Sequence, residues 1–178
     1  MTKKTNYTII AVLLITLGLV SRLLPHPANF APIAAIAIFG GLYLPKRWAI
    51  ILPVIAMFVS DIFIGFYDLR IMLAVYGSFA VVGLIGLLVR KNKKAATVIG
   101  GTILGSILFF IITNFAVWAF GSMYTHSFAG LIQCYNMAIP FFKNTLLGDL
   151  FYTGILVGAF ETFTKFANCG KVILSRTP

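Results

Sequence analysis

Long apolar runs, separated by short polar or proline-containing breaks, dominate the pattern of the chain. Six of them approach or exceed the ~20 residues that an α-helix needs to cross the hydrocarbon core of a bilayer. These runs lie at about residues 7–24, 29–44, 48–66, 70–89, 97–120 and 142–166. The pattern predicts an all-α integral membrane protein, a compact bundle of about six transmembrane helices that forms a single transmembrane domain over residues 1–178.

The first break predicts an ordered loop and a short second helix. It contains Pro25 and Pro27, which cannot continue a helix, so the chain is expected to turn tightly there. Asn29 is expected to cap the second helix, with Pro32 tolerated in its first turn. At ~1.5 Å per residue, a helix over residues 29–44 is about 24 Å long, which is less than the ~30 Å of a bilayer core.

The composition excludes an ordinary soluble domain. The chain of 178 residues is 60% hydrophobic and only 10% charged, whereas soluble domains carry roughly 25% charged residues. Its net charge of +10 would favour nucleic acid only if basic residues were mixed with accessible aromatic residues on one face. Here the basic residues lie between apolar runs, where they orient helices in a membrane. No nucleic-acid partner is therefore expected.

The distribution of Lys and Arg predicts the orientation of the six spans. Eleven of the 14 basic residues fall on one side: Lys3, Lys4, Lys46, Arg47, Arg90, Lys91, Lys93, Lys94, Lys165, Lys171 and Arg176. Only Arg22, Arg70 and Lys143 fall on the other side. Because cytoplasmic loops carry the excess of basic residues, we expect a multi-pass protein of the cytoplasmic membrane with both termini in the cytoplasm.

The acidic residues are concentrated toward the outer side. The sequence has four of them: Asp61, Asp68 and Asp149 toward the outside, and Glu161 near the inner surface. Ionisable groups inside a bilayer are costly and usually mark a pathway, a partner or a site. Their distribution predicts a pocket that faces outward. For Asp61 two interpretations stay open, a ligand contact or an ion pair with Arg22 or Arg70 that holds helices together.

Two helix faces add polar groups to this outer half. One carries Thr145, Gly148, Asp149 and Tyr152, and it follows residues 141–144, where the sixth helix is expected to begin with free backbone N–H groups. The other pairs Asn114 with Trp118 at a spacing of i, i+4. The alternative for the first face is that Asp149 is only salt-bridged. The alternative for the second is that Asn114 only holds helices together, with Trp118 as an interfacial anchor.

These faces define the candidate site. The expected substrate-binding residues are Asp61, Asn114, Trp118, Asn144, Asp149 and Tyr152. The expected gate consists of Arg22, His26 and Asn29 around the first loop. Together with these three, polar residues of the predicted outer loop at about 121–140 are expected to form a lid over the pocket: Tyr124, His126, Gln133, Tyr135 and Asn136.

No catalytic, metal or cofactor site is expected. The sequence has no P-loop, no H-E-x-x-H and no G-x-S-x-G motif, so an enzyme is not indicated. Cys134 is expected in the outer loop and Cys169 in the inner tail, so the two thiols should not meet.

Several segments resemble those of a family of small bacterial membrane proteins of unknown function, described as candidate transport proteins. They are residues 24–32, Ser60-Asp61, residues 76–79, Thr113-Asn114-Phe115-x-x-Trp118 and residues 140–149. The similarity extends over most of the chain from Leu24 to about Glu161. It implies a protein of the bacterial inner membrane.

That family is similar, in size and six-helix layout, to the substrate-binding S components of energy-coupling factor (ECF) vitamin transporters. The resemblance implies capture of a micronutrient from outside, followed by tilting of the subunit, driven by a transmembrane coupling protein with two ATPases. S components commonly carry A-x-x-x-A on the first helix, whereas residues 10–18 lack it here and Ala31-x-x-x-Ala35 has only the spacing. Docking on a shared module and solitary operation both stay open.

The leading hypothesis is therefore a transport subunit that captures a small vitamin-like or base-like molecule. Its expected partners are this substrate, membrane lipid and, if it works like S components, the coupling protein with its ATPase subunits. Acidic residues beside Asn and aromatic residues suit a neutral or cationic planar molecule, whereas Arg22, Arg70 and Lys143 would also admit an anion. The alternative is a structural or scaffold membrane subunit, whose outer polar cluster only holds helices and partners together.

Overall fold

The computed structural model describes the backbone of residues 3–174 and the side chains of residues 7–166. Within these residues the fold is all-α, with six helices and no strand. The helices are α1 (Lys3–Leu23), α2 (Ile33–Tyr43), α3 (Trp48–Ile64), α4 (Leu69–Val89), α5 (Ala95–Phe120) and α6 (Phe128–Leu174). The predicted all-α class and helix number are thereby confirmed for this part of the chain.

Three of the described helices are long and apolar enough to cross a membrane. They are α4 over Leu69–Val89, α5 over Ala95–Phe120 and the part of α6 over Phe128–Phe166. Shorter apolar helices occupy Tyr7–Leu23, Ile33–Tyr43 and Trp48–Ile64. The chain thus has the helices of a membrane protein, and the six-span arrangement stays a prediction.

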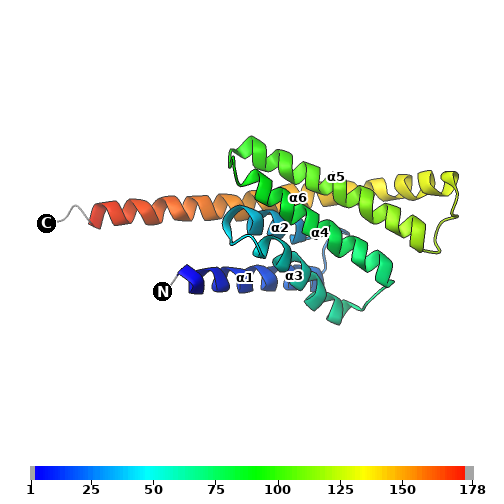
Figure 1. Ribbon diagram of the computed structural model, residues 1–178, viewed down its shortest axis with the longest axis horizontal. Helices are drawn as coiled ribbons and strands as arrows, with labels where there is room; N and C mark the ends of the chain where they lie inside the picture. The colour runs from blue at the N-terminus through cyan, green and yellow to red at the C-terminus, as the bar shows by residue number, and fades with distance from the viewer. Residues whose placement is uncertain (1–2, 175–178) are drawn as a thin grey trace.

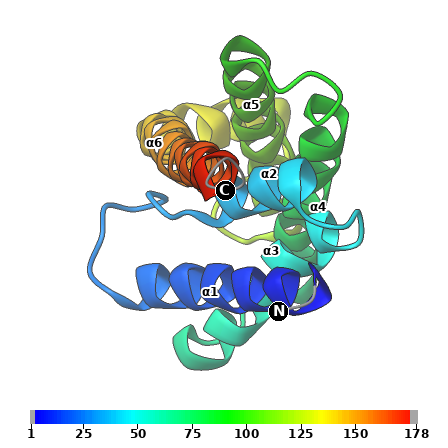
Figure 2. The same ribbon diagram turned by 90° about the vertical axis from the view of Figure 1, so that its left-hand side faces the viewer.

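Helix α2 forms the centre of the bundle. Ten of its 11 residues, Ile33 through Leu42, are buried, and it packs against each of the other five helices. Figure 2, which looks along the bundle, shows α2 surrounded by its neighbours. The segment is made of Ile, Ala, Gly, Phe and Leu on every side, as expected of a helix with no solvent-facing or lipid-facing surface.

Small residues allow the central helices to approach closely. A Cβ added to Gly41 in α2 would lie 2.6 Å from the carbonyl carbon of Gly86 in α4. A Cβ on Gly83 would lie 1.9 Å from the carbonyl oxygen of Ala49 in α3. Because only glycine leaves room for such contacts, α4 can pack against both α2 and α3 in this narrow space.

The connections lie at two opposite ends of the bundle (Figure 1). The basic end holds loops 44–47 and 90–94, together with the N-terminal part of α1 and the C-terminal part of α6. There Arg90 Nη1 donates a hydrogen bond of 2.9 Å to the carbonyl oxygen of Leu44, which joins the two basic loops. The distal end holds loops 24–32, 65–68 and 121–127.

The largest difference from the sequence prediction concerns α6. It begins at Phe128 rather than near Phe142 and runs through Pro140. The connection between α5 and α6 therefore contains only residues 121–127. At ~1.5 Å per residue its 47 residues extend about 70 Å, well beyond a bilayer core of ~30 Å. Residues 141–144 are therefore inside a helix, and the prediction that the sixth helix begins there with free backbone N–H groups is wrong.

Two smaller predictions also need correction. Asn29 does not cap α2, because Pro32 occupies the N-cap position, and Asn29 instead adopts a φ of 63° in the loop. Cys134 is buried within α6 rather than in a loop. The prediction that it does not meet Cys169 lies outside the described residues, because they do not include the Cys169 side chain.

Candidate functional site

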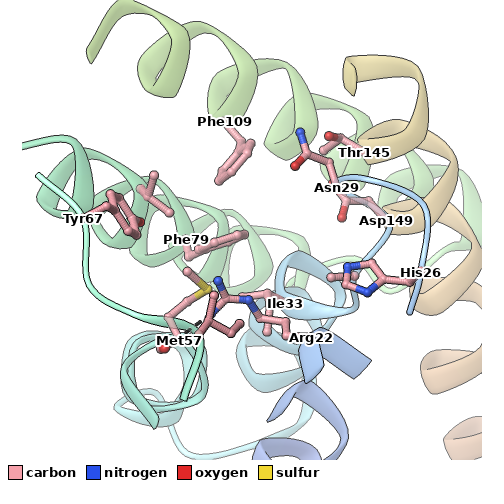
Figure 3. Close-up of a pocket in the computed structure, with 13 residues that line it drawn as sticks. Arg22, His26, Asn29, Ile33, Met57, Tyr67, Phe79, Phe109, Thr145 and Asp149 are labelled. Atoms are coloured by element: carbon pink, nitrogen blue, oxygen red, sulfur yellow. Dashed lines mark hydrogen bonds between the residues drawn. The ribbon is translucent and has the colours of Figure 1, made fainter. Parts of the chain in front are cut away.

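The distal half of the bundle contains a cavity of about 380 Å³, hereafter the distal cavity. Its volume lies within the ~300–1,000 Å³ range of small-molecule pockets. The lining combines polar and apolar side chains from all six described helices and two loops: Arg22, His26, Asn29, Ala31, Ile33, Met57, Ile64, Tyr67, Val75, Phe79, Phe109, Thr145 and Asp149. Figure 3 shows Asn29, Thr145 and Asp149 together on one side, with Arg22, Met57 and Ile33 on another.

Asp149 provides a buried carboxylate on the cavity wall. Its side chain is only 3% exposed, and Oδ2 accepts a hydrogen bond of 2.7 Å from the hydroxyl of Ser106 in α5. Thr145 lies one turn earlier on α6 and faces the same cavity. Among the described side chains, no Lys, Arg or His lies within ion-pair distance of Asp149.

Arg22 and Asp61 form a second buried polar group beside the cavity. Arg22 Nη1 lies 2.7 Å from Asp61 Oδ1 and also donates to the hydroxyl of Ser60. The second carboxylate oxygen, Oδ2, accepts a hydrogen bond of 2.6 Å from the Tyr76 hydroxyl of α4. The ion pair with Arg22, one of the two interpretations of Asp61, is confirmed. Asp61 itself does not line the distal cavity, whereas its partner Arg22 does.

The first loop is held against α6 beside the cavity. The side-chain amide of Asn144 donates to the carbonyl oxygen of Ala28 over 3.1 Å. Phe30 packs on the Tyr152 ring, with centroids 5.5 Å apart. Phe30 also lies close to Gly148, where an added Cβ would come 3.2 Å from the Phe30 ring. Asn144, Gly148 and Tyr152 thus position the loop, whereas Thr145 and Asp149 face the cavity.

Aromatic residues form much of the remaining wall. Phe79 and Phe109 pack together with ring centroids 4.7 Å apart, and both line the cavity. Tyr67 in the loop before α4 also lines it, and burial together with the charge of Asp61 raises the pKa of Tyr67 to about 12. The Tyr67 side chain therefore keeps its hydroxyl proton and contributes a neutral polar group.

Asn114 lies in a neighbouring cavity of about 230 Å³ rather than in the distal cavity itself. The two share part of their lining: Asn29, Val75, Phe109 and Thr145. The side-chain amide of Asn114 donates to the carbonyl oxygen of Phe110 over 2.8 Å, within its own helix. The smaller cavity is therefore an extension of the distal cavity toward α5.

Trp118 and the expected lid residues lie farther out. Trp118 Nε1 donates to the carbonyl oxygen of Thr125 over 3.0 Å, and its ring packs against Phe115 and His126. The Tyr135 hydroxyl donates to the carbonyl oxygen of Ile111 over 2.7 Å. The Trp118 contacts join α5 to the connection 121–127, and the Tyr135 bond joins α5 to α6. None of the five outer-loop residues expected in the lid lines the distal cavity.

A separate groove of about 550 Å³ lies between α5 and α6 on the basic side of Asp149. Thr102 and Thr153 lie on it, and the hydroxyl of Thr153 has no hydrogen-bond partner among the described residues. At the end nearest the basic loops, Glu161 accepts a hydrogen bond of 2.6 Å from the Tyr43 hydroxyl. The groove is thus largely apolar, with few polar groups along its length.

Several residues of the site escaped the sequence analysis. Met57, Phe79 and Phe109 line the cavity, but an apolar residue in an apolar helix carries no signal that separates a cavity wall from ordinary core. Ser106 was also missed, although a hydroxyl in the middle of an apolar helix needs a partner and its bond to Asp149 supplies one. Ala35, considered for docking, is fully buried in α2.

The chain belongs to a family of unknown function, DUF6580, which matches residues 2–169. This confirms the resemblance to a family without an assigned function, whereas the likeness to S components stays a prediction. No curated protein and no solved structure matches the chain.

Proposed function

We propose that this protein is a membrane transport subunit that captures a small vitamin-like or base-like molecule from the outside in the distal cavity and carries it inward. The observation that carries the proposal is Asp149, a carboxylate 3% exposed on the wall of a cavity of about 380 Å³ without a cationic partner among the described residues. A buried ionisable group in an apolar helix is costly, and a ligand contact offsets that cost.

The positions of the basic loops support the direction of capture. Loops 44–47 and 90–94 lie at the end opposite to the distal cavity. If the basic end is cytoplasmic, as the excess of Lys and Arg favours, the cavity opens to the outer side of a bacterial inner membrane. All six helices then cross or enter the bilayer, with both termini in the cytoplasm.

The loop contacts support a gate. Loop 24–32 contributes His26 and Asn29 to the lining and is held to α6 by Asn144 and by the packing of Phe30. Separation of these contacts would open the cavity from the side of the loop. Inward movement would follow by tilting of the subunit, either with a coupling protein and ATPases or alone.

A structural or scaffold role is the second candidate, and a specific observation favours it. The ion pair of Arg22 and Asp61, with the hydrogen bond from Tyr76, joins α1, α3 and α4 through buried polar groups. These residues serve helix packing whether or not a ligand binds. In a scaffold subunit, Asp149 and Ser106 would serve in the same way between α6 and α5.

Mass spectrometry of small molecules released from the purified protein separates the two candidates. The protein is isolated in mild detergent without added ligand, as wild type, as Asp149→Asn and as Glu161→Gln. The control makes the same acid-to-amide change on the same helix, outside the distal cavity. Capture predicts a stoichiometric compound in wild type and in the control that is lost from Asp149→Asn. Recovery of lipid alone from all three, across several growth media, would favour the scaffold role.

A further inference from the structure

The charge of the captured molecule follows from which ionic groups around the distal cavity already have a partner. Arg22 lines the cavity, but its charge is matched by Asp61 at 2.7 Å. Arg70 pairs with Asp68 at 3.3 Å, and its guanidinium lies over the Phe120 ring at 5.1 Å. Neither Arg70 nor the third distal basic residue, Lys143, lines the cavity. The cations of the distal end therefore offer little to an anionic ligand.

Asp149 is the opposite case. It is 3% exposed, lines the cavity, and has one neutral donor, the Ser106 hydroxyl at 2.7 Å. Its other carboxylate oxygen accepts no hydrogen bond from the described residues, so it is available to the contents of the cavity. A cation placed there would gain a charge-assisted hydrogen bond where water is largely excluded.

Two further polar groups of the lining, Thr145 and His26, present acceptors to the cavity. The Thr145 hydroxyl donates its proton to the carbonyl oxygen of Phe141 over 3.0 Å, which leaves its oxygen lone pairs for the cavity. His26 Nδ1 lies 2.7 Å from the carbonyl oxygen of Leu24. Because a carbonyl only accepts, Nδ1 is the donor and Nε2 of the neutral ring is an acceptor. A ligand rich in N–H donors fits this set.

The aromatic wall favours the same kind of molecule. Phe79 and Phe109 line the cavity, and in Figure 3 they lie between Asp149 and Tyr67. Phenylalanine rings attract cations through their negative faces and pack well against flat apolar groups. A planar cationic head with an apolar body would use both features at once.

We propose that the captured molecule is a small organic cation with at least two N–H donors on a planar or apolar body, and that Asp149 binds its cationic head. This inference rests on the proposed capture function and specifies its substrate class. It selects the cationic alternative from those that the sequence left open.

Matched probes of different charge test the inference. Benzamidine is a planar cation with two nitrogen donors, benzamide is its neutral counterpart and benzoate its anionic counterpart. Binding of each to the detergent-purified protein is measured by the shift in unfolding temperature as the probe concentration rises. We expect the Kd of benzamidine to be lower than that of benzamide by about tenfold or more, as for charge-assisted hydrogen bonds, and benzoate to give no shift.

Variants connect the effect to Asp149. Asp149→Asn should raise the Kd of benzamidine by about tenfold or more, whereas Glu161→Gln should leave it unchanged. If Asp149→Asn fails to fold, the three probes on the wild-type protein still decide, because equal stabilisation by benzamide or benzoate would overturn the proposal.

The outcomes separate the substrate class from the function itself. Equal stabilisation by benzamide or benzoate, or an unchanged Kd of benzamidine in Asp149→Asn, would overturn the cationic class and leave capture standing. If no probe binds, the compound released from the purified protein decides: a cation supports the inference and a neutral or anionic compound overturns it. No probe binding and no released compound would overturn capture and the inference together.

Discussion

Arg22 in α1 and Asp61 in α3 form an ion pair of 2.7 Å in which Asp61 is 1% exposed and the Arg22 side chain 17%. The carboxylate also accepts from the Tyr76 hydroxyl of α4 over 2.6 Å. Two charges removed from solvent stabilise a fold only when each satisfies the other, and removal of one partner leaves the other uncompensated. The pair therefore holds α1 in place beside the distal cavity.

The first prediction concerns this ion pair. Arg22→Met should lower the free energy of unfolding by about 3–5 kcal/mol, because it leaves the Asp61 carboxylate buried without a cation. Asp61→Asn should also destabilise the protein, and the double variant should lose less than the sum of the two. Denaturant unfolding in detergent, followed by circular dichroism, measures these differences. Tyr76→Phe is the control, since it removes one hydrogen bond and no charge. Strict additivity of the two substitutions would contradict the coupling.

The second prediction concerns the close contact between α4 and α3. Gly83→Ala should abolish folding or lower stability by more than about 3 kcal/mol, because the new Cβ would overlap backbone that cannot move away. The added Cβ would lie 1.9 Å from the carbonyl oxygen of Ala49. Gly77 on the same helix has nothing within 4 Å of an added Cβ, so Gly77→Ala is the matched control.

Gly77→Ala should leave stability unchanged or raise it by up to ~1 kcal/mol, the difference in helix propensity between the two residues. The yield of monodisperse protein and its unfolding temperature distinguish the variants. Similar behaviour of Gly83→Ala and Gly77→Ala would mean that α3 and α4 do not approach each other as closely as described.

Hydrophobic runs and charge predict much of this fold because they reflect local chemistry. The breaks at Pro25 and Pro27 and at residues 90–94 each contain residues that resist burial or cannot continue a helix, and the helices end there. The spacing of Thr145 and Asp149 put both on one face, and both line the cavity. Such features follow from the sequence without knowledge of the neighbouring helices.

Other features depend on contacts that no local pattern contains. Pro140 has no backbone N–H and favours a break, yet α6 continues through it, so the start of this helix was misplaced. Trp118 is equally suited to stack on a ligand or to anchor a loop. Its hydrogen bond to the Thr125 carbonyl shows that it anchors the loop. Phe79 and Phe109 become part of the cavity only through packing between helices.

The third prediction uses pH and the cap of α4. Asp68 accepts hydrogen bonds from the backbone N–H groups of Arg70 and Ile71, and the Arg70 side chain together with these bonds lowers the pKa of Asp68 from its usual 3.8. A carboxylate with a lowered pKa contributes stability above pH 3.8 that is lost as the pH falls through the folded-state pKa.

Asp68→Asn removes the charge and keeps a residue that caps helices well. The difference in unfolding temperature between wild type and this variant should therefore be constant at neutral pH and shrink as the pH falls below 3.8. Asp68→Ala, which removes the cap as well, should stay less stable than Asp68→Asn over the whole range. A difference between wild type and Asp68→Asn that does not change with pH would contradict the lowered pKa.

The fourth prediction concerns Trp118. Trp118→Phe removes the hydrogen bond to the Thr125 carbonyl and keeps an aromatic ring, so the connection 121–127 should become more sensitive to limited proteolysis. Retention of the captured molecule should be unchanged, because Trp118 lines neither the distal cavity nor its extension. Loss of the molecule with an unchanged proteolysis pattern would instead assign Trp118 to ligand binding, as predicted from the sequence.

The fifth prediction concerns the groove between α5 and α6. Thr153 is 4% exposed, and its hydroxyl has no hydrogen-bond partner among the described residues. Thr153→Val keeps the shape and removes the unsatisfied group, so it should stabilise the protein by about 1 kcal/mol. Thr102 on the same groove donates to the Val98 carbonyl over 2.9 Å, so Thr102→Val should not stabilise and serves as the control. The unfolding temperatures of wild type, Thr153→Val and Thr102→Val, measured under the same conditions, test this prediction. A loss of stability in Thr153→Val would show that this hydroxyl binds a group present in the groove.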